Sequence, residues 1–135
     1  MTGKHDAAPP PSAVAVVERF WQLMASNDFD SVGVVLSDDF VLDWPQSNER
    51  IRGRDNFAGM NRTYPAHGPW QFTVQRLFGN ACEVVSDVEV TDGVQHARAL
   101  SFFTVEAGLI THLREYWPED YDAPENRAQW VEPRV

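Results

Sequence analysis

An aspartate stands inside an apolar, strand-like segment, which is an unusual place for this residue. Asp43 lies between Leu42 and Trp44 in the sequence FVLDWPQS, just before the chain turns at Pro45. Strands disfavour Asp because its carboxylate competes with the backbone for hydrogen bonds. Asp43 therefore either marks the mouth of a pocket, where it would act as a base, or caps the frayed end of a strand.

Three further acidic residues, from strand-like segments of the C-terminal half, are candidates for the same site. Because side chains alternate between the two faces of a strand, Glu115 shares a face with Leu113 and Trp117, and Asp87 shares one with Glu89. Carboxylates gathered in a poorly solvated site cannot all ionise cheaply, so some would have raised pKa values and act as acids or bases. Such groups suit proton abstraction next to a carbonyl, dehydration, or activation of water on an epoxide.

The histidines and the single cysteine indicate no metal site. His5 lies in the N-terminal segment, His67 lies in a loop, and alternation places His96 and His112 on the outward face of the strands. No pair has the i, i+4 helical spacing of a zinc site. Cys82 excludes an internal disulfide and is expected to be a buried strand residue. We therefore expect no metal and no cofactor, and His96 would reach a pocket only if a bulge shifted its strand.

Length and composition predict one globular domain. The chain has 135 residues, of which 43% are hydrophobic, and a formal net charge of -9. This charge argues against binding to nucleic acid or to an anionic membrane surface, since both need basic patches. No apolar run is long enough to span a bilayer, and the N-terminal segment does not resemble a signal peptide. We expect a flexible leader over residues 1–11, a single domain over 12–135, and a cytoplasmic location.

The order of the predicted elements indicates an α+β domain. Helical spacing of apolar residues begins at Ser12, which can cap the first turn. Gly93 and Gly108 separate later strands and are expected to supply positive φ. Trp130, in the irregular tail, is expected to pack back on the domain. Helices come first and antiparallel strands follow, with helices over 12–24, 28–36 and 56–65 and strands over 40–44, 71–78, 82–90, 96–106 and 109–117.

Three stretches of the chain resemble a known superfamily. They are VVERFWQLMASNDFDSVGVVLSDDF, DWPQSNERIRGRDNF and THLREYWPEDY. From about Val14 to Trp117 the chain is similar to the nuclear transport factor 2-like superfamily. Within it, the chain looks most like the SnoaL-like branch that includes ketosteroid isomerases and polyketide cyclases, in a subgroup of mostly unassigned activity. The resemblance implies a cone-shaped α+β barrel, in which a strongly curved, mainly antiparallel sheet wraps around three helices of the N-terminal half. It also implies a deep apolar pocket and a homodimer through the outer face of the sheet.

The resemblance also assigns candidate site residues. In ketosteroid isomerases a strand aspartate just before a proline is the general base, and Asp43 falls at that position with a one-residue shift at Trp44. The resemblance turns the Glu115, Ser101 and Asp87 faces toward the cavity, and Glu115 becomes the second catalytic candidate. The pocket residues that it implies are Phe20, Trp21, Met60, Tyr64, Asp87, Glu89, Ser101, Phe103, Leu113 and Trp117.

Two departures from the family pattern argue against steroid isomerisation. Those isomerases stabilise the enolate with a tyrosine on the first helix and a protonated acid on a later strand. Here the corresponding positions hold Phe20 and Ser101. Because Phe20 cannot donate a hydrogen bond, a steroid isomerase would lack most of its oxyanion hole.

Two classes of function follow. One is a cofactor-independent acid–base enzyme of isomerase, cyclase, dehydratase or epoxide hydrolase type, acting on a small apolar molecule through Asp43 and Glu115. The alternative is a non-catalytic small-ligand binder or dimerisation module, in which arginines pair with the carboxylates. Arg50, Arg52 and Arg54 are the candidates to pair with Asp43, or to dock an anionic ligand group. The fold hosts both classes, so it does not choose between them.

Overall fold

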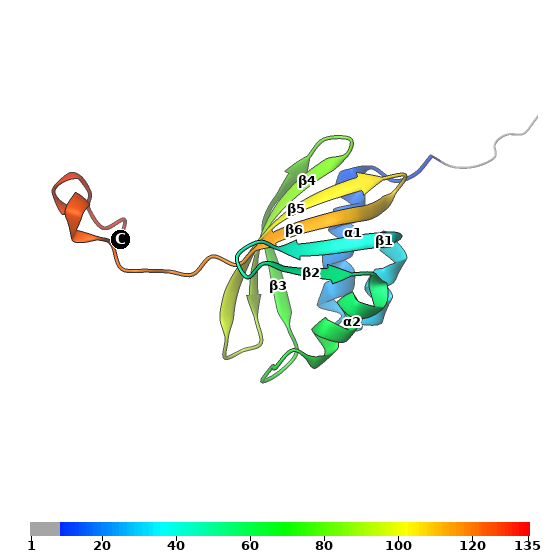
Figure 1. Ribbon diagram of the computed structural model, residues 1–135, viewed down its shortest axis with the longest axis horizontal. Helices are drawn as coiled ribbons and strands as arrows, with labels where there is room; N and C mark the ends of the chain where they lie inside the picture. The colour runs from blue at the N-terminus through cyan, green and yellow to red at the C-terminus, as the bar shows by residue number, and fades with distance from the viewer. Residues whose placement is uncertain (1–8) are drawn as a thin grey trace, which may run out of the picture.

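The N-terminal half of the chain forms the helical layer. The computed structural model describes residues 9–135, and its helices in this half are α1 (Ala13–Ala25), the 3-10 helix η1 (Phe29–Val35) and α2 (Arg54–Thr63). The Oγ atom of Ser12 caps α1 by accepting a hydrogen bond from the backbone N–H of Ala15 at 3.1 Å. Figure 1 shows these helices together on one side of the sheet.

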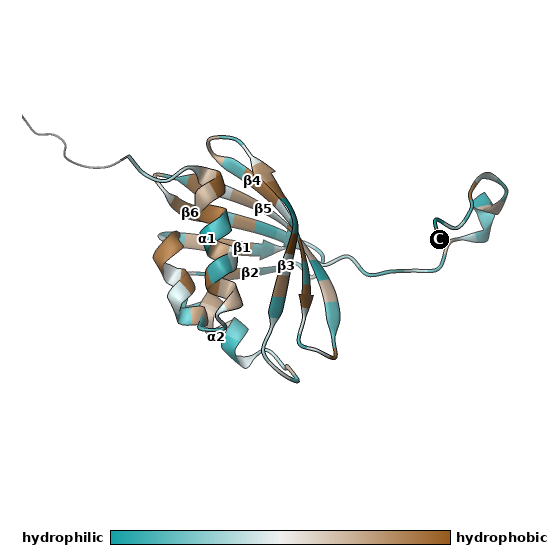
Figure 2. Ribbon diagram, turned by 180° about the vertical axis from the view of Figure 1, so that it is seen from behind, coloured by the Kyte–Doolittle hydropathy of each residue, from teal (hydrophilic) through white to brown (hydrophobic). Residues whose placement is uncertain are grey.

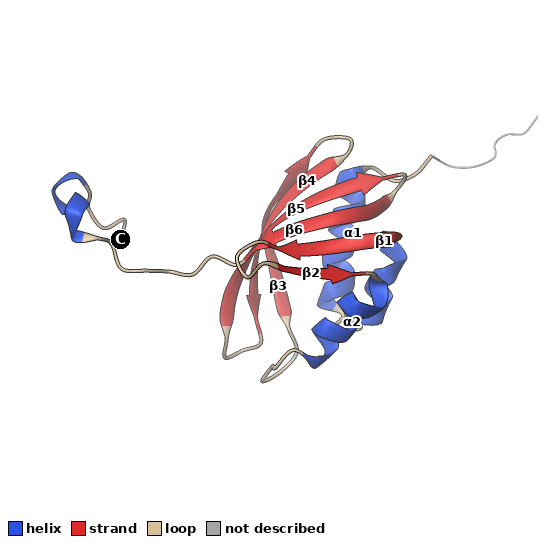
Figure 3. Ribbon diagram, viewed as in Figure 1, coloured by secondary structure: helices blue, strands red, loops and turns tan. Residues whose placement is uncertain are grey.

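The sheet has six strands and is curved around the helices (Figures 1 and 3). Its order is β2-β1-β6-β5-β4-β3, with β1 and β6 parallel and all other neighbours antiparallel. The predicted α+β class with a mainly antiparallel sheet is confirmed, and the glycines expected in two turns, Gly93 and Gly108, have φ of 95° and 79°. The strands are β1 (Leu36–Trp44), β2 (Glu49–Arg52), β3 (Gln71–Gly79), β4 (Glu83–Thr91), β5 (His96–Glu106) and β6 (Leu109–Tyr116).

Aromatic side chains dominate the core between the helices and the sheet. Phe20 of α1 packs edge-on against Phe103 of β5, with ring centroids 5.2 Å apart, and Phe40 of β1 packs edge-on against Phe57 of α2 at 5.7 Å. These geometries are the ones that aromatic pairs prefer. Figure 2 shows apolar residues along the strands that the helices cover. Phe20 and Phe57 belong both to this core and to the wall of the cavity described below.

Two sequence predictions outside the site are wrong. Cys82 is exposed because it lies in the turn before β4, where its backbone N–H donates to Asn80 Oδ1 at 3.0 Å. Trp130 is 79% exposed on the short 3-10 helix η2 (Glu125–Trp130). The acidic, proline-containing tail that carries Trp130 extends away from the domain after β6 (Figure 1).

The predicted leader falls mostly outside the described residues, and its residues 9–11 are exposed. Between residues 9 and 135, no helix combines the length and the apolar composition needed to cross a membrane.

Candidate functional site

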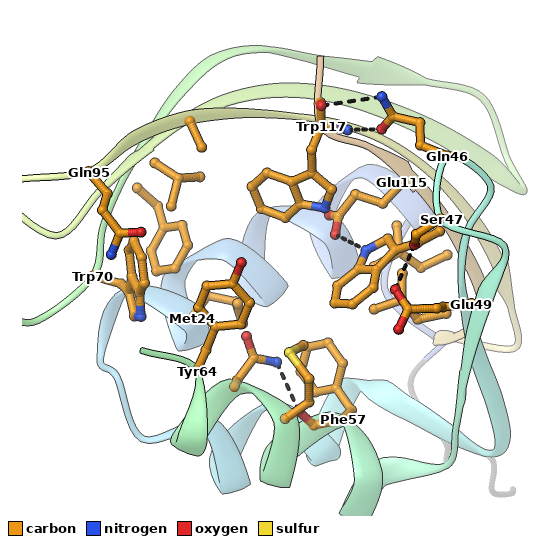
Figure 4. A pocket seen from close by; sticks show the side chains of 18 of the residues that line it. Met24, Gln46, Ser47, Glu49, Phe57, Tyr64, Trp70, Gln95, Glu115 and Trp117 are labelled. Carbon is orange, nitrogen blue, oxygen red and sulfur yellow. Dashed lines mark hydrogen bonds between the residues drawn. The ribbon is translucent and has the colours of Figure 1, made fainter. Parts of the chain in front are cut away.

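A cavity of about 1030 Å³ lies between the helices and the concave face of the sheet. Aromatic side chains form much of its wall, which suits a small organic ligand and excludes bulk water. Figure 4 shows Tyr64, Trp70, Met24 and Trp117 around a common open space. The aromatic residues that line the cavity are Phe20, Trp21, Trp44, Phe57, Tyr64, Trp70, Phe72 and Trp117.

Helical periodicity explains how the two helices supply one wall. Phe57, Met60, Asn61 and Tyr64 are three or four residues apart, on α2 and just after it, so they share the face that looks into the cavity. Phe20, Trp21 and Met24 are related in the same way on α1. The structure therefore places the predicted residues Phe20, Trp21, Met60 and Tyr64 at the cavity.

Glu115 is the buried carboxyl group of the cavity. It lies on β6, is 5% exposed, and shares its inward face with Leu113 and Trp117, which also line the cavity. Its Oε2 accepts a hydrogen bond from Ser101 Oγ at 2.7 Å, and its Oε1 accepts one from Trp44 Nε1 at 3.2 Å. No lysine, arginine or histidine within the described chain forms an ion pair with it.

The surroundings of Glu115 favour its neutral form. Burial raises the pKa of the Glu115 carboxyl above its ordinary value of 4.5, and the hydrogen bonds from Ser101 and Trp44 only partly oppose this effect. A raised pKa makes the protonated carboxyl easier to populate, and a carboxyl group that exchanges between its two forms can donate a proton to a bound molecule and take it back. Glu115 is therefore equipped to act as an acid or a base toward a ligand.

Polar side chains hold Glu115 from across the sheet. Ser101 lies opposite Glu115 in the β5–β6 register and opposite Ser86 in the β4–β5 register. Trp21 Nε1 donates to Ser86 Oγ at 3.1 Å, so this second buried serine also has a partner. Ser101 itself is fully buried beneath the cavity wall. Ser101 was predicted to line the pocket, but it does not, because its hydroxyl lies behind Glu115 and donates to that carboxyl.

Asp43 does not face the cavity, so its predicted position at the mouth of the pocket is wrong. Leu42 and Trp44 take the inward positions of β1, and alternation turns Asp43 to the outer face. There Arg50, its register partner on β2, donates from Nε at 2.6 Å and from Nη2 at 2.9 Å. His112 Nε2 lies 2.9 Å from the same carboxylate.

The partners of Asp43 keep it ionised. The hydrogen bonds from Arg50 hold the pKa of the Asp43 carboxyl well below its usual range. Partial burial acts in the opposite direction, and His112 lowers the pKa further. Asp43 therefore has the charge and the partners of a structural ion pair, which is the alternative that the sequence left open.

Asp87 and Glu89 also lie on the outer face, in contrast to the prediction. Arg98 of β5 donates to both Asp87 oxygens, at 2.8 and 2.6 Å, and this pairing lowers the pKa of the Asp87 carboxyl. Glu89 is exposed. The opposite face of β4 is the buried one because it carries the apolar residues of the strand together with one bonded serine: Val84, Ser86, Val88 and Val90. Phe103 likewise belongs to the aromatic core and does not line the cavity.

Two residues that line the cavity, Trp44 and His96, were not among the predicted pocket residues. Alternation places Trp44 on the same face of the strand as Leu42. The prediction that Asp43 faces inward assigned Trp44 to the opposite face. His96 lines the cavity with Ala97, although alternation predicted an outward position. His96 is the first residue of β5, so the alternation of the strand does not yet govern its position. Its two neighbours in the sequence, Gln95 and Ala97, also line the cavity.

A buried aspartate fastens the loops at the cavity mouth. The Asp92 carboxylate accepts hydrogen bonds from the backbone N–H groups of His67, Val94 and Gln95, and from Gln95 Nε2. Burial alone would raise the pKa of Asp92, but these donors outweigh it and the pKa is lowered. The contacts join the β4–β5 turn to the loop before β3 and so position Gln95, which lines the mouth of the cavity.

Throughout residues 9–135, no three His, Cys, Asp or Glu side chains are grouped to hold a metal ion.

Comparison with known proteins agrees with this architecture. A family model described as a SnoaL-like domain matches residues 17–113. A structure from Kribbella flavida, named as a candidate ketosteroid isomerase, is 29% identical with a TM-score of 0.81, covering 90% of this chain and 88% of that one. An NTF2-like protein of unknown function from Burkholderia xenovorans is 28% identical with a TM-score of 0.73, covering 90% and 94%.

A third solved structure links the fold to a different reaction. It is an LEH-like epoxide hydrolase from M. tuberculosis, 25% identical with a TM-score of 0.64, covering 78% of this chain and 82% of that chain. No curated protein matches the chain. The similarities confirm the predicted cone-like α+β fold, and the two activities that the names of these structures give differ from each other.

Proposed function

The chain belongs to the SnoaL-like domain family, and from this premise we propose that it binds a small apolar organic molecule and transfers a proton to or from it through Glu115. Isomerases, cyclases and epoxide hydrolases share this fold, so the family leaves the reaction open. The observation that carries the proposal is a buried carboxyl group, set in the wall of an aromatic cavity, that has no cationic partner among residues 9–135.

The chemistry follows from the protonation state of Glu115. A neutral carboxyl can donate its proton to a carbonyl or epoxide oxygen as charge develops there, and the resulting carboxylate can then accept a proton from carbon or water. Aromatic walls keep water away from this exchange. Steroid isomerisation is not proposed, because Phe20 offers no hydrogen-bond donor and the Ser101 hydroxyl is directed to Glu115.

The first experiment is a screen for ligands and for turnover. Trp21, Trp44, Trp70 and Trp117 line the cavity, so a bound molecule is expected to change tryptophan fluorescence. Apolar ketones, lactones and epoxides that alter the fluorescence are then followed by NMR for conversion. Conversion by the wild-type protein supports the proposal. The absence of any binding across the screen contradicts it.

A non-catalytic binder is the second candidate, and one observation favours it. Both Glu115 oxygens already accept hydrogen bonds, from Ser101 and Trp44, which could fix the carboxyl as a recognition group. Ligands that bind and are released unchanged would support this candidate over the enzyme.

The proposal includes a homodimer through the outer face of the sheet. Phe78 of β3, Val85 of β4 and Phe102 of β5 lie directly opposite one another in the strand register. Phe78 is 62% exposed and Phe102 is 38% exposed, and the Arg114 guanidinium covers the Phe102 ring at 5.4 Å. This row of apolar side chains is the surface that a second copy would cover.

Placing a charge in that row is expected to separate the dimer. Phe78→Glu would bury an unpaired carboxylate at the interface, so sedimentation should shift from dimer to monomer. Val34→Glu changes an equally exposed apolar residue on the helical side and should leave the dimer intact. Equal sedimentation of Phe78→Glu and the wild type would remove this interface from the proposal.

A cytoplasmic location and a single domain over residues 12–135 remain parts of the proposal. Their support is the acidic composition, the single cysteine and the continuous sheet. Cell fractionation would test the location, and limited proteolysis would test the domain limits.

A further inference from the structure

The charges of the cavity all have one sign apart from one histidine. Glu49, Glu115 and Glu119 line it, and His96 is its one residue that can become cationic. No lysine or arginine appears among its described lining residues, although the whole chain has 11 of them. Two arginines instead lie on the outer face of the sheet, where Arg50 bonds to Asp43 and Arg98 bonds to Asp87. Apart from His96, the described lining of the cavity therefore has no basic side chain to neutralise an anionic ligand.

The aromatic walls suit a positive charge. Trp44, Tyr64, Trp70 and Trp117 line the cavity, and the Tyr64 and Trp70 rings meet edge-on at 6.1 Å. The face of an aromatic ring carries negative potential, so it attracts an ammonium group, most strongly when the ring is that of tryptophan. Trp44 Nε1 donates to Glu115 Oε1 at 3.2 Å, and Trp117 lies two residues after Glu115 and lines the same cavity (Figure 4), so indole rings and a potential anion share this wall.

No cation of the described residues neutralises Glu115. A cationic ligand could supply this missing charge. Its oxygens accept one hydrogen bond each, whereas a carboxylate has about four acceptor positions. We propose that the cavity binds an apolar organic cation, an amine or a quaternary ammonium compound, with its charged head beside Glu115 and its apolar body against the aromatic walls. This inference rests on the proposed function, since it names the ligand class of the same cavity.

Ligands of other charge fit less well. An anion would face three carboxyl groups with no guanidinium or ammonium group to bind it. A neutral molecule of the same shape would fill the apolar walls and gain nothing from Glu115 or from the ring faces. The net charge of -9 also raises the local concentration of cations around the chain.

Binding of a cation should be coupled to loss of a proton from Glu115. Burial favours the neutral carboxyl in the free protein, whereas a neighbouring cation favours the carboxylate. Affinity for a permanent cation should therefore rise with pH until Glu115 is ionised without a ligand. The other titratable groups around the cavity are Glu49 of β2, Tyr64 after α2, His96 of β5 and Glu119 after β6. His96→Gln separates the titration of His96 from that of Glu115.

Three probes of similar size and different charge test the inference. They are phenyltrimethylammonium, its neutral isostere tert-butylbenzene, and the anion benzenesulfonate. None of them titrates between pH 5 and 9, so any pH dependence belongs to the protein. At pH 8 we expect the cation to bind at least about tenfold more tightly than the neutral isostere. Calorimetry in two buffers of different ionisation enthalpy should show proton release with the cation alone.

Each outcome decides between the proposals. Equal binding of the cation and the neutral isostere keeps the apolar cavity and overturns the cation inference, as does tighter binding of benzenesulfonate. Failure of all three probes overturns the cation inference and contradicts the cavity proposal as well. In Glu115→Gln the preference for the cation should fall to about threefold or less, while tert-butylbenzene binding stays unchanged. If this variant does not fold, the proton release of the wild-type protein still decides the question.

Discussion

Glu115→Gln is expected to lower turnover of any substrate found for the cavity by about 10²- to 10⁴-fold, with ligand binding retained. The amide has the shape of the carboxyl and can still accept a hydrogen bond from Ser101 or Trp44, but it cannot transfer a proton. The measurement is kcat and KM for wild type and variant, with fluorescence titration for binding. A fall in kcat at nearly constant ligand affinity is the expected pattern.

Asp43→Asn is the matched control for this prediction. It makes the same carboxylate-to-amide change on the neighbouring strand, at an ion-paired residue outside the cavity. We expect turnover within about twofold of wild type, because Asp43 contacts Arg50 and His112 and does not line the cavity. Loss of turnover in Asp43→Asn, with Glu115→Gln still active, would reverse the assignment.

Phe103→Ala is expected to reduce the free energy of unfolding by about 3–5 kcal/mol, as for other large aromatic residues removed from a core. Phe103 is 2% exposed and contacts the Phe20 ring at 5.2 Å and the Trp21 ring at 6.4 Å between centroids. Its removal would leave a void where helix α1 packs on β5. Urea unfolding, monitored by tryptophan fluorescence, measures the change.

The next residue of the same strand supplies the control. Phe102 points to the outer face and is 38% exposed, so Phe102→Ala should cost no more than about 1 kcal/mol. Both variants are compared in the Phe78→Glu background, which removes any contribution from the proposed dimer. Similar losses for Phe102→Ala and Phe103→Ala would show that the core is not organised around Phe103.

The fold was predictable because its signals are local and repeated. The spacing of Val17, Trp21 and Met24 fixes the buried face of α1, and the two turn glycines mark the hairpins. Strand alternation also grouped Leu113, Glu115 and Trp117 correctly on one face. The resemblance then supplied the side of the sheet on which that face lies.

The errors at the site have a common physical cause. Alternation tells which residues share a face and does not tell which face is buried, and a shift of one residue reverses every side chain. On β1 the resemblance predicted that Asp43 faces the cavity. In the structure the next residue, Trp44, faces the cavity instead. On β4 the valines were the better guide, since Val84 and Val88 are fully buried and Asp87 lies opposite them.

The pairing of charges was the least predictable feature. Arg50 meets Asp43 through the β1–β2 register, and Arg98 bonds to Asp87 across the pair of strands β4 and β5. Such pairs depend on which strands become neighbours, which no local pattern specifies. That no cation of the described residues pairs with Glu115 is a property of the folded chain for the same reason, and it identifies the candidate site.

The most direct test is the pKa of the Glu115 carboxyl, measured by carbon-detected NMR titration and assigned by the loss of its signal in Glu115→Gln. A pKa above the ordinary value of 4.5 is predicted, because the carboxyl is buried and no cation of the described residues pairs with it. A pKa at or below 4.5 would mean that Glu115 is already ionised in the free protein, and would contradict its assignment as the proton-transferring group of the cavity.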